Sequence, residues 1–337
     1  MNKKYFLIPV VVNLFDGNPN TNVTTQTELK PEIKTYYEKR LLENTKPYLV
    51  HRLFGQKRPI PQGGGDKIEF RRVGTLPAIT SPLEEGKTPD GQKMSITAIT
   101  AQVHQYGGYV THSDFLKMTA VDPIVDIAVD IISDQAGLSL DTLSREALNA
   151  GTNVQYAEGQ VASRSALVGG AGTGNHYLTA MAIRMAARTL RITRAPKIDG
   201  YYVAIIHPAV SHDLKSDPEW RDPHKYKDTT NLYTGEIGML DGVRFVESTE
   251  VKIFEGAGKD GRDVYSTLVL GKNAYGVTEV EGGGLKIIVK QLGSAGTADP
   301  LDQRATVGWK ATDVTTILNQ EHIVRIETTA SVDNLAA

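Results

Sequence analysis

The amino-acid sequence predicts an α+β protein whose 337 residues are enough for two or three compact units. Three observations predict this class. A long helical pattern runs from Asp122 to Gly151, and strand-like apolar runs recur from Tyr201 onward. An unusually long polar stretch, 74–92, separates two further strand patterns. With 40% hydrophobic and 23% charged residues, the composition is typical of a soluble globular chain.

Cysteine usage and the N-terminal residues limit the class further. The chain has 0 cysteines, which excludes disulfides and thiolate metal sites. Lys3 and Lys4 precede an apolar run as in a signal peptide, but Pro9 interrupts that run and no small-residue cleavage site follows. No run approaches the ~18 apolar residues of a membrane helix. We therefore expect an ordinary structural segment at the N-terminus and no membrane partner.

The net charge of −2 hides an asymmetry along the chain. Residues 1–75 carry 13 Lys and Arg against 7 Asp and Glu, a net charge of +6, whereas the remainder carries 24 against 32, a net charge of −8. A basic segment joined to an acidic body is suited to head-to-tail contact between identical subunits. The same basic charge is open to nucleic acid, but the acidic body disfavours that alternative, and few aromatic residues lie among the basic ones.

Residues 1–27 are rich in Asn, Thr and Gly and show no sustained period, which predicts an arm that only partners order. A helix is expected next, from a Thr27 cap to about Asn44, with Pro47 ending it. Within the arm, aromatic and aliphatic side chains are candidate anchors in a neighbour's groove: Tyr5, Phe6, Leu14 and Phe15.

Two strand patterns flank the polar stretch. Ile68, Phe70 and Val73 alternate before it, and Ile96 and Ile99 begin a second pattern after it. A compact domain rarely carries such a long projection without a reason. We interpret the segment 73–106 as a hairpin, either a mobile surface loop or a cover on a neighbouring subunit. The basic residues around its start are candidate inter-subunit contacts, with a solvated turn as the alternative: Lys57, Arg58, Lys67, Arg71 and Arg72.

The clearest helix begins at Asp122 and Pro123, where an Asp can cap free N–H groups and a Pro is tolerated. About 27 residues at ~1.5 Å each would span roughly 40 Å. The apolar stripe expected to be buried consists of Ile124, Ile127, Ala128, Ile131, Gln135 and Leu138, with a phase shift near Gly137 before Leu140, Leu143 and Ala147. Gly151 is expected as the C-terminal cap.

Further along the chain, a helix is predicted over 178–193. Strands are predicted at 201–206, 243–247, 264–270, 285–290, 306–310 and 322–327.

The sequence offers little for catalysis. In the Ser211-His212-Asp213 triplet, adjacent side chains point apart, so a helix start with Ser211 as its cap is the better interpretation. His207, His212 and His224 have no familiar zinc spacing, and the glycines of 169–174 lack the Lys-Ser/Thr ending of a phosphate loop. We therefore expect no catalytic, cofactor or metal site. A hydrolase that uses His207 or His212 is kept as a less favoured alternative.

Several short segments, in order along the chain, resemble the major capsid proteins of tailed phages, in particular the family typified by coliphage N-four. They are Asn13-Leu14-Phe15-Asp16-Gly17, Leu29-Lys30-Pro31-Glu32-Ile33-Lys34-Thr35-Tyr36-Tyr37, Phe54-Gly55-Gln56-Lys57-Arg58-Pro59-Ile60-Pro61, Ile68-Glu69-Phe70, His207-Pro208, Asp217-Pro218-Glu219-Trp220, and the GEIG-x-x-x-G-x-R run from Gly235 to Arg244. No single segment is decisive, whereas their order over nearly the whole length is specific.

The resemblance implies an α+β Hong Kong 97-type capsid fold. Its expected parts are an N-terminal arm and short helix (1–48), an extended hairpin loop (49–111), a peripheral domain with a long spine helix (112–175), an axial domain (176–300), and return strands of the peripheral domain with the C-terminus (301–337). It also implies self-assembly through pentamers and hexamers into an icosahedral head around double-stranded DNA, bound without sequence specificity. Portal and scaffolding or decoration proteins are the other expected partners, and the virion, assembled in the bacterial cytoplasm, is the expected location. A decoration or tail protein is the alternative.

Overall fold

The computed structural model describes residues 40, 41, 44, 49–74, 76–158, 161–169, 174, 176–220 and 236–332. The predicted arm and nearly all of the predicted helix before Pro47 lie outside these residues. Four α-helices are described: α2 (Asp114–Thr119), α3 (Ile124–Asn149), α4 (Ala180–Ile192) and α5 (Pro208–Ser216).

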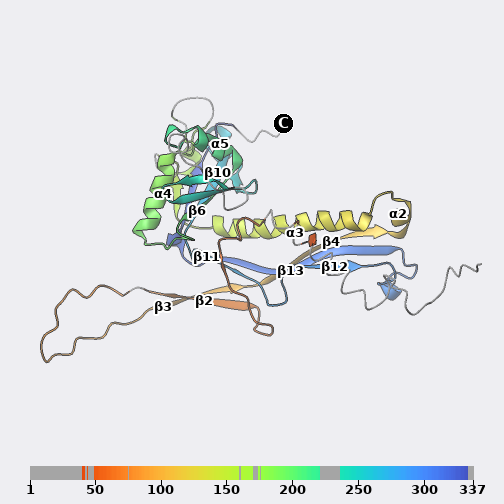
Figure 1. Cartoon of the computed structure of the whole chain (residues 1–337), viewed down its shortest axis with the longest axis horizontal. Helices are drawn as coiled ribbons and strands as arrows, with labels where there is room; N and C mark the ends of the chain where they lie inside the picture. The colour runs from red at the N-terminus through yellow and green to blue at the C-terminus, as the bar shows by residue number, and fades with distance from the viewer. Residues whose placement is uncertain are drawn as a thin grey trace, which may run out of the picture.

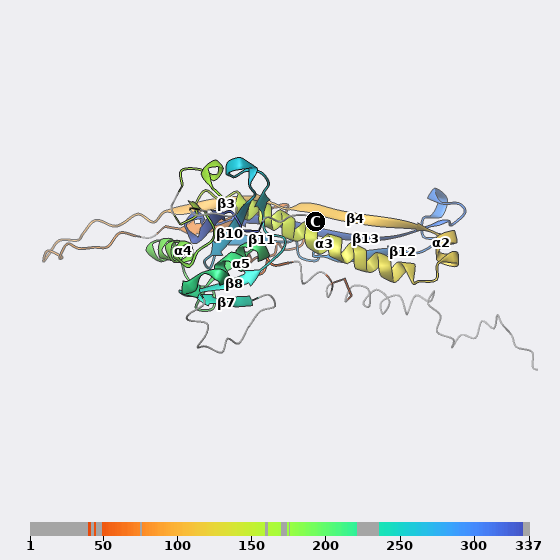
Figure 2. The same cartoon turned by 90° about the horizontal axis from the view of Figure 1, so that it is seen from above.

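A mixed sheet forms the elongated part of the molecule. Its strand order is β1-β11-β13-β12, and β4 also pairs with β13, over Arg304–Asp313. The strands are β1 (Gln56–Lys57), β4 (His104–Ser113), β11 (Tyr275–Thr278), β12 (Lys286–Lys290) and β13 (Arg304–Ile317). Helix α3 lies along this sheet, as Figures 1 and 2 show.

A seven-stranded sheet forms the compact body at one end, in the order β5-β14-β10-β6-β8-β7 with β9 paired to β10. Helices α4 and α5 lie in this body (Figure 1). The strands are β5 (Val154–Tyr156), β6 (Tyr202–Ile206), β7 (Glu236–Leu240), β8 (Val243–Glu247), β9 (Ile253–Phe254), β10 (Val264–Leu270) and β14 (Ile323–Thr328). Strands β6, β10 and β14 are buried at every position. Burial explains the continuous apolar run of β6, whereas the two charged residues of β14, Arg325 and Glu327, pair with each other.

The strands predicted from apolar runs are confirmed in this body and in the elongated sheet. Strand β13 extends well beyond the predicted 306–310, because it pairs in turn with β4, β12 and β11. The remaining two strands, β2 (Lys67–Val73) and β3 (Ile96–Gln102), form the predicted hairpin. The predicted hairpin segment reaches Tyr106, whereas His104 onward already belongs to β4.

The long helix is confirmed, but of its predicted stripe only Ala128 and Leu140 are buried. Its buried side chains include Val129, Ile132, Ala136, Leu140 and Leu148, which continue at helical spacing without a phase shift at Gly137. Ile131, which was expected inside, is 59% exposed. The helix carries two adjacent apolar stripes, and contact with β13 selects the one that contains small residues, which let the helix approach the sheet closely.

The predicted ends of this helix also need correction. Pro123 occupies the N-cap position, and no side-chain hydrogen bond caps the helix there, so Asp122 does not cap it. At the other end, Ala150 rather than Gly151 is the C-cap. A side-chain cap is a small contribution to a helix of 26 residues that is stabilised mainly by packing.

Candidate assembly surfaces

The hairpin projects from the molecule and ends in a long tip. Strands β2 and β3 pair from Lys67 opposite Gln102 to Val73 opposite Ile96, and the described residues between them, 74 and 76–95, have no regular strand or helix. Figure 1 shows this tip extending past the compact body. Large apolar side chains are exposed along it, with Leu83 at 75%. A segment that exposes such side chains has no core of its own within the subunit.

The root of the hairpin is firmly packed, in contrast to its tip. Ile68, Phe70 and Ala101 form a buried cluster with neighbouring apolar residues. The Phe70 ring lies against Gly276 of β11, where an added Cβ would meet a ring carbon at 2.7 Å. Gly276 is therefore needed for this close approach, and the hairpin is held rigidly where it leaves the body.

The predicted basic residues do not form one patch. Arg71 and Arg72 are adjacent on β2, so their side chains point to opposite faces. Arg71 is 73% exposed and lies 3.1 Å from Glu69, whereas Arg72 lies 3.7 Å from Glu321 near the C-terminal strand.

The other predicted contact residues lie elsewhere. Lys67 is exposed on β2, whereas Lys57 and Arg58 lie at β1 beside a hollow whose lining also includes Leu285. The predicted arm anchors, Tyr5, Phe6, Leu14 and Phe15, lie outside the described residues.

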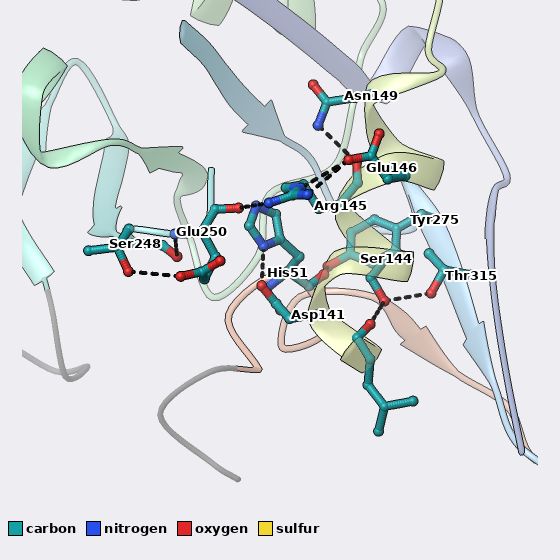
Figure 3. A network of polar contacts seen from close by, with 12 residues as sticks. His51, Asp141, Ser144, Arg145, Glu146, Asn149, Ser248, Glu250, Tyr275 and Thr315 are labelled. Atoms are coloured by element: carbon teal, nitrogen blue, oxygen red, sulfur yellow. Dashed lines mark hydrogen bonds and ion pairs between the residues drawn. The ribbon is translucent and has the colours of Figure 1, made fainter. Parts of the chain in front are cut away.

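A buried polar network fixes the segment before the hairpin to α3 (Figure 3). The backbone N–H of His51 donates to one carboxylate oxygen of Asp141 at 2.8 Å, and the His51 ring Nδ1 lies 2.6 Å from the other oxygen. The Tyr275 hydroxyl donates to the His51 carbonyl oxygen. The His51 and Asp141 side chains are fully buried, so this pair has no access to a substrate. Its role is to join helix, sheet and hairpin segment.

Next to this network, Arg52 lies 3.0 Å from the carboxylate of Asp313 on β13. Burial raises the pKa of Asp313 to about 6, although the Arg52 guanidinium acts in the opposite direction. Sequence inspection missed both pairs. Their members are 90 or more residues apart, and no local spacing signals them.

The histidines kept as hydrolase candidates are not arranged for catalysis. The His207 ring accepts from the backbone N–H of Ala209 and thereby caps α5, and burial lowers its pKa. Ser211 lies inside α5 rather than at its cap, and its hydroxyl donates to Pro208 and Glu247. The Asp213 carboxylate accepts hydrogen bonds from Ser331. No nucleophile, base and orienting carboxylate are therefore aligned among these residues.

Two further searches covered the described ranges only. Within them, no group of three His, Cys, Asp or Glu side chains is placed to hold a metal ion. No helix among the same residues is long and apolar enough to cross a membrane.

Comparison with known proteins identifies the architecture. The chain has the fold of a phage capsid protein. The "Capsid of Ralstonia phage GP4" matches with a TM-score of 0.66 at 15% identity, over 84% of this chain and 88% of that chain. The "Cyanophage Pam1 capsid asymmetric unit" matches with a TM-score of 0.65 at 14% identity, over 86% of this chain and 93% of that one.

The same fold occurs in a complex of another kind. The holo-SrpI encapsulin complex from Synechococcus elongatus matches with a TM-score of 0.52 at 12% identity, over 85% of this chain and 88% of that chain. Residues 142–290 match the model of a family described as "Phage capsid protein". The comparison with curated proteins gives no match. The family match and the capsid structures together support a structural shell protein.

Proposed function

We propose that this chain is the major capsid protein of a tailed phage, and that it self-assembles into the icosahedral head that encloses double-stranded DNA. The observation that carries the proposal is the likeness to phage capsid structures over more than four fifths of the chain, together with the family match in 142–290. The role is structural, and no enzymatic step is assigned.

The parts of the molecule take their roles by resemblance to the Hong Kong 97-type fold and the coliphage N-four family. Helix α3 is the spine helix of a peripheral domain formed by 112–175 and by the return strands in 301–337. Residues 176–300 form the axial domain, which meets its copies around five-fold and six-fold centres. The segment 49–111 carries the extended hairpin, and 1–48 supplies the arm and a short helix.

In this proposal the arm and the hairpin connect neighbouring subunits. The subunits form pentamers and hexamers. Portal and scaffolding or decoration proteins complete the head in the host cytoplasm. DNA is held without base-specific contacts.

Particle formation tests the proposal directly. The purified chain, alone and with its phage partners, should form closed shells or capsomers, seen as large species in light scattering and as icosahedral particles in electron microscopy. A chain that stays monomeric at all concentrations and salts, even with those partners, would rule the proposal out. Tubes or sparse binding to preformed heads would instead favour a tail or decoration protein.

A further inference from the structure

The end of the elongated sheet that lies away from the compact body carries a hollow that the proposed function does not use. Figures 1 and 2 both show α2 and the start of α3 together at this end. The hollow has a volume of about 410 Å³. Its lining includes His112 of β4, Lys117 that follows it in α2, Ala305 of β13, and Ile124 and Val125 in the first turn of α3. We call it the α3 hollow.

Strand register places the His112 ring on the side of the sheet that faces α3. His112 lies opposite Ala305 of β13, and residues directly opposite each other share a face. Trp309 lies an even number of residues after Ala305, so it shares that face as well. The Trp309 ring donates to Gln135 of α3 at 3.1 Å, which shows that this face points toward the helix. His112 therefore belongs to the wall of the α3 hollow and not to the outer side of the sheet.

His112 is a buried polar side chain that lacks a partner. It is 6% exposed, and its ring Nδ1 has no hydrogen bond within the described part of the chain. Burial lowers the pKa of His112, and the Lys117 ammonium acts in the same direction, so the ring is neutral at pH 7. A neutral imidazole still carries one N–H to donate. A buried ring nitrogen without a partner, in the wall of a hollow, is accounted for when a polar ligand occupies that hollow.

The first turn of α3 supplies further hydrogen-bond donors. No side chain caps the helix at Pro123. The Pro123 carbonyl oxygen accepts from the backbone N–H groups of Asp126 and Ile127. Those of Ile124 and Val125 have no hydrogen bond among the described residues. The start of a helix carries about half a positive charge, and its free N–H groups are suited to binding an anion.

The charges around the hollow also favour an anion. Its lining carries two ammonium groups and two carboxylates, which cancel: Lys117, Lys290, Asp122 and Asp126. Arg40 lies 3.7 Å from Asp126 and offsets part of its charge, and the helix start adds a positive contribution. A metal ion is disfavoured, since no group of three His, Cys, Asp or Glu side chains in the described ranges is placed to hold one.

We propose that the α3 hollow binds free inorganic phosphate, with the His112 ring, the Lys117 ammonium and the free N–H groups at the start of α3 as donors. A phosphate ion presents oxygens in several directions, so one ion can accept from all three sources. A carboxylate of a second copy of the chain is the rival source of the same chemistry. The inference goes beyond the proposed function and does not depend on it, because one subunit contains every residue of the site.

Calorimetric titration of the purified chain with inorganic phosphate, in chloride buffer at constant ionic strength, tests the site. We expect a single phosphate to bind and the unfolding temperature to rise with its concentration. His112→Ala and Lys117→Ala should each weaken binding about tenfold or more, because each removes a donor to the anion. Lys259→Ala is the control, since it removes an exposed ammonium elsewhere on the molecule and should bind as the parent chain does.

A matched pair at the helix start tests the backbone donors. Ile124→Pro removes one free N–H at the first helical position, where Pro is well tolerated, whereas Ile124→Ala keeps that N–H. Ile124→Pro should therefore weaken phosphate binding about tenfold or more, and Ile124→Ala should leave it unchanged. Thermal unfolding without phosphate checks that each variant is folded.

Three outcomes would overturn the inference. The first is a parent chain that binds no phosphate. The second is unchanged binding in Lys117→Ala and Ile124→Pro, which both keep the buried His112 ring and so remain informative if His112→Ala fails to fold. The third is acetate binding as tight as that of phosphate, which would assign the hollow to a carboxylate of a neighbouring copy. Normal shells from a chain that binds no phosphate would leave the proposed function in place.

Discussion

At the scale of single residues, Asp313 is the buried ionisable group with the clearest consequence. Its folded pKa of about 6 lies above the usual 3.8, so between these values the unfolded chain loses its proton first. Unfolding then becomes easier as the pH rises, and the free energy of unfolding falls by up to about 1.4 kcal/mol for each pH unit across this window.

Replacing Asp313 with Asn should flatten that part of the profile, because the group no longer titrates. Urea unfolding of the subunit between pH 4 and pH 6.5 measures this, with Asp90→Asn in the exposed tip as the control. Parallel profiles for the parent chain and Asp313→Asn would contradict the assignment.

Arg71 and Arg72 provide a second test at residue scale. Replacing both with Glu should impair shell formation while the subunit stays folded, because the pairs that they make within the chain are exposed and contribute ~0–1 kcal/mol each. Arg71→Glu should have the larger effect of the two single changes, since Arg71 is the more exposed. Shell yield by sedimentation and the thermal transition of each subunit are the measurements. Unchanged yield in the double variant would show that these arginines are only solvated.

At the scale of elements, helix α3 allows a matched pair of substitutions at adjacent positions. Ile132 is 1% exposed and Ile131 is 59% exposed. Ile132→Ala should destabilise the subunit by about 2–5 kcal/mol, because it leaves a cavity against β13. Ile131→Ala should change the free energy of unfolding by less than about 0.5 kcal/mol. If both variants lose the same free energy of unfolding in denaturant, α3 presents a different face to the sheet than the one described here.

The hairpin is the element whose state should depend most on assembly. Its root is buried around Phe70, whereas its tip has no core. Amide hydrogens of the tip should therefore exchange quickly in the free subunit and slowly in the shell, while those of β2 and β3 near the root are protected in both. Hydrogen exchange with mass spectrometry reports the two states. A tip that is equally protected in both would show that no neighbour covers it.

At the scale of the whole molecule, assembly should depend on the segment 1–27. Its aromatic and aliphatic side chains contribute roughly 1.5–3 kcal/mol each when buried, which offsets the cost of ordering the segment once a neighbour supplies a groove. Deleting 1–27 should leave the thermal transition of the subunit nearly unchanged and reduce or misdirect shell formation. A truncated chain that fails to fold as a subunit would place the segment in the internal core instead.

The sequence by itself determined the local elements of this protein. Continuous apolar runs such as Tyr202–Ile206 predicted buried strands, alternation in Lys67–Val73 predicted a hairpin strand, and helical spacing predicted α3. These predictions were possible because the spacing of apolar residues along a short segment indicates the type of element that the segment forms. The ordered segments also pointed to the capsid fold that the structural comparison shows.

Only the tertiary structure decided which surfaces meet. Ile131 and Ile132 are equally apolar, and contact with β13 decides which one is buried. The His51–Asp141 pair joins residues 90 positions apart, and the register of β12 and β13 places Lys286 opposite Lys310. These features depend on distances between segments that are remote along the chain, and local pattern carries no information about such distances.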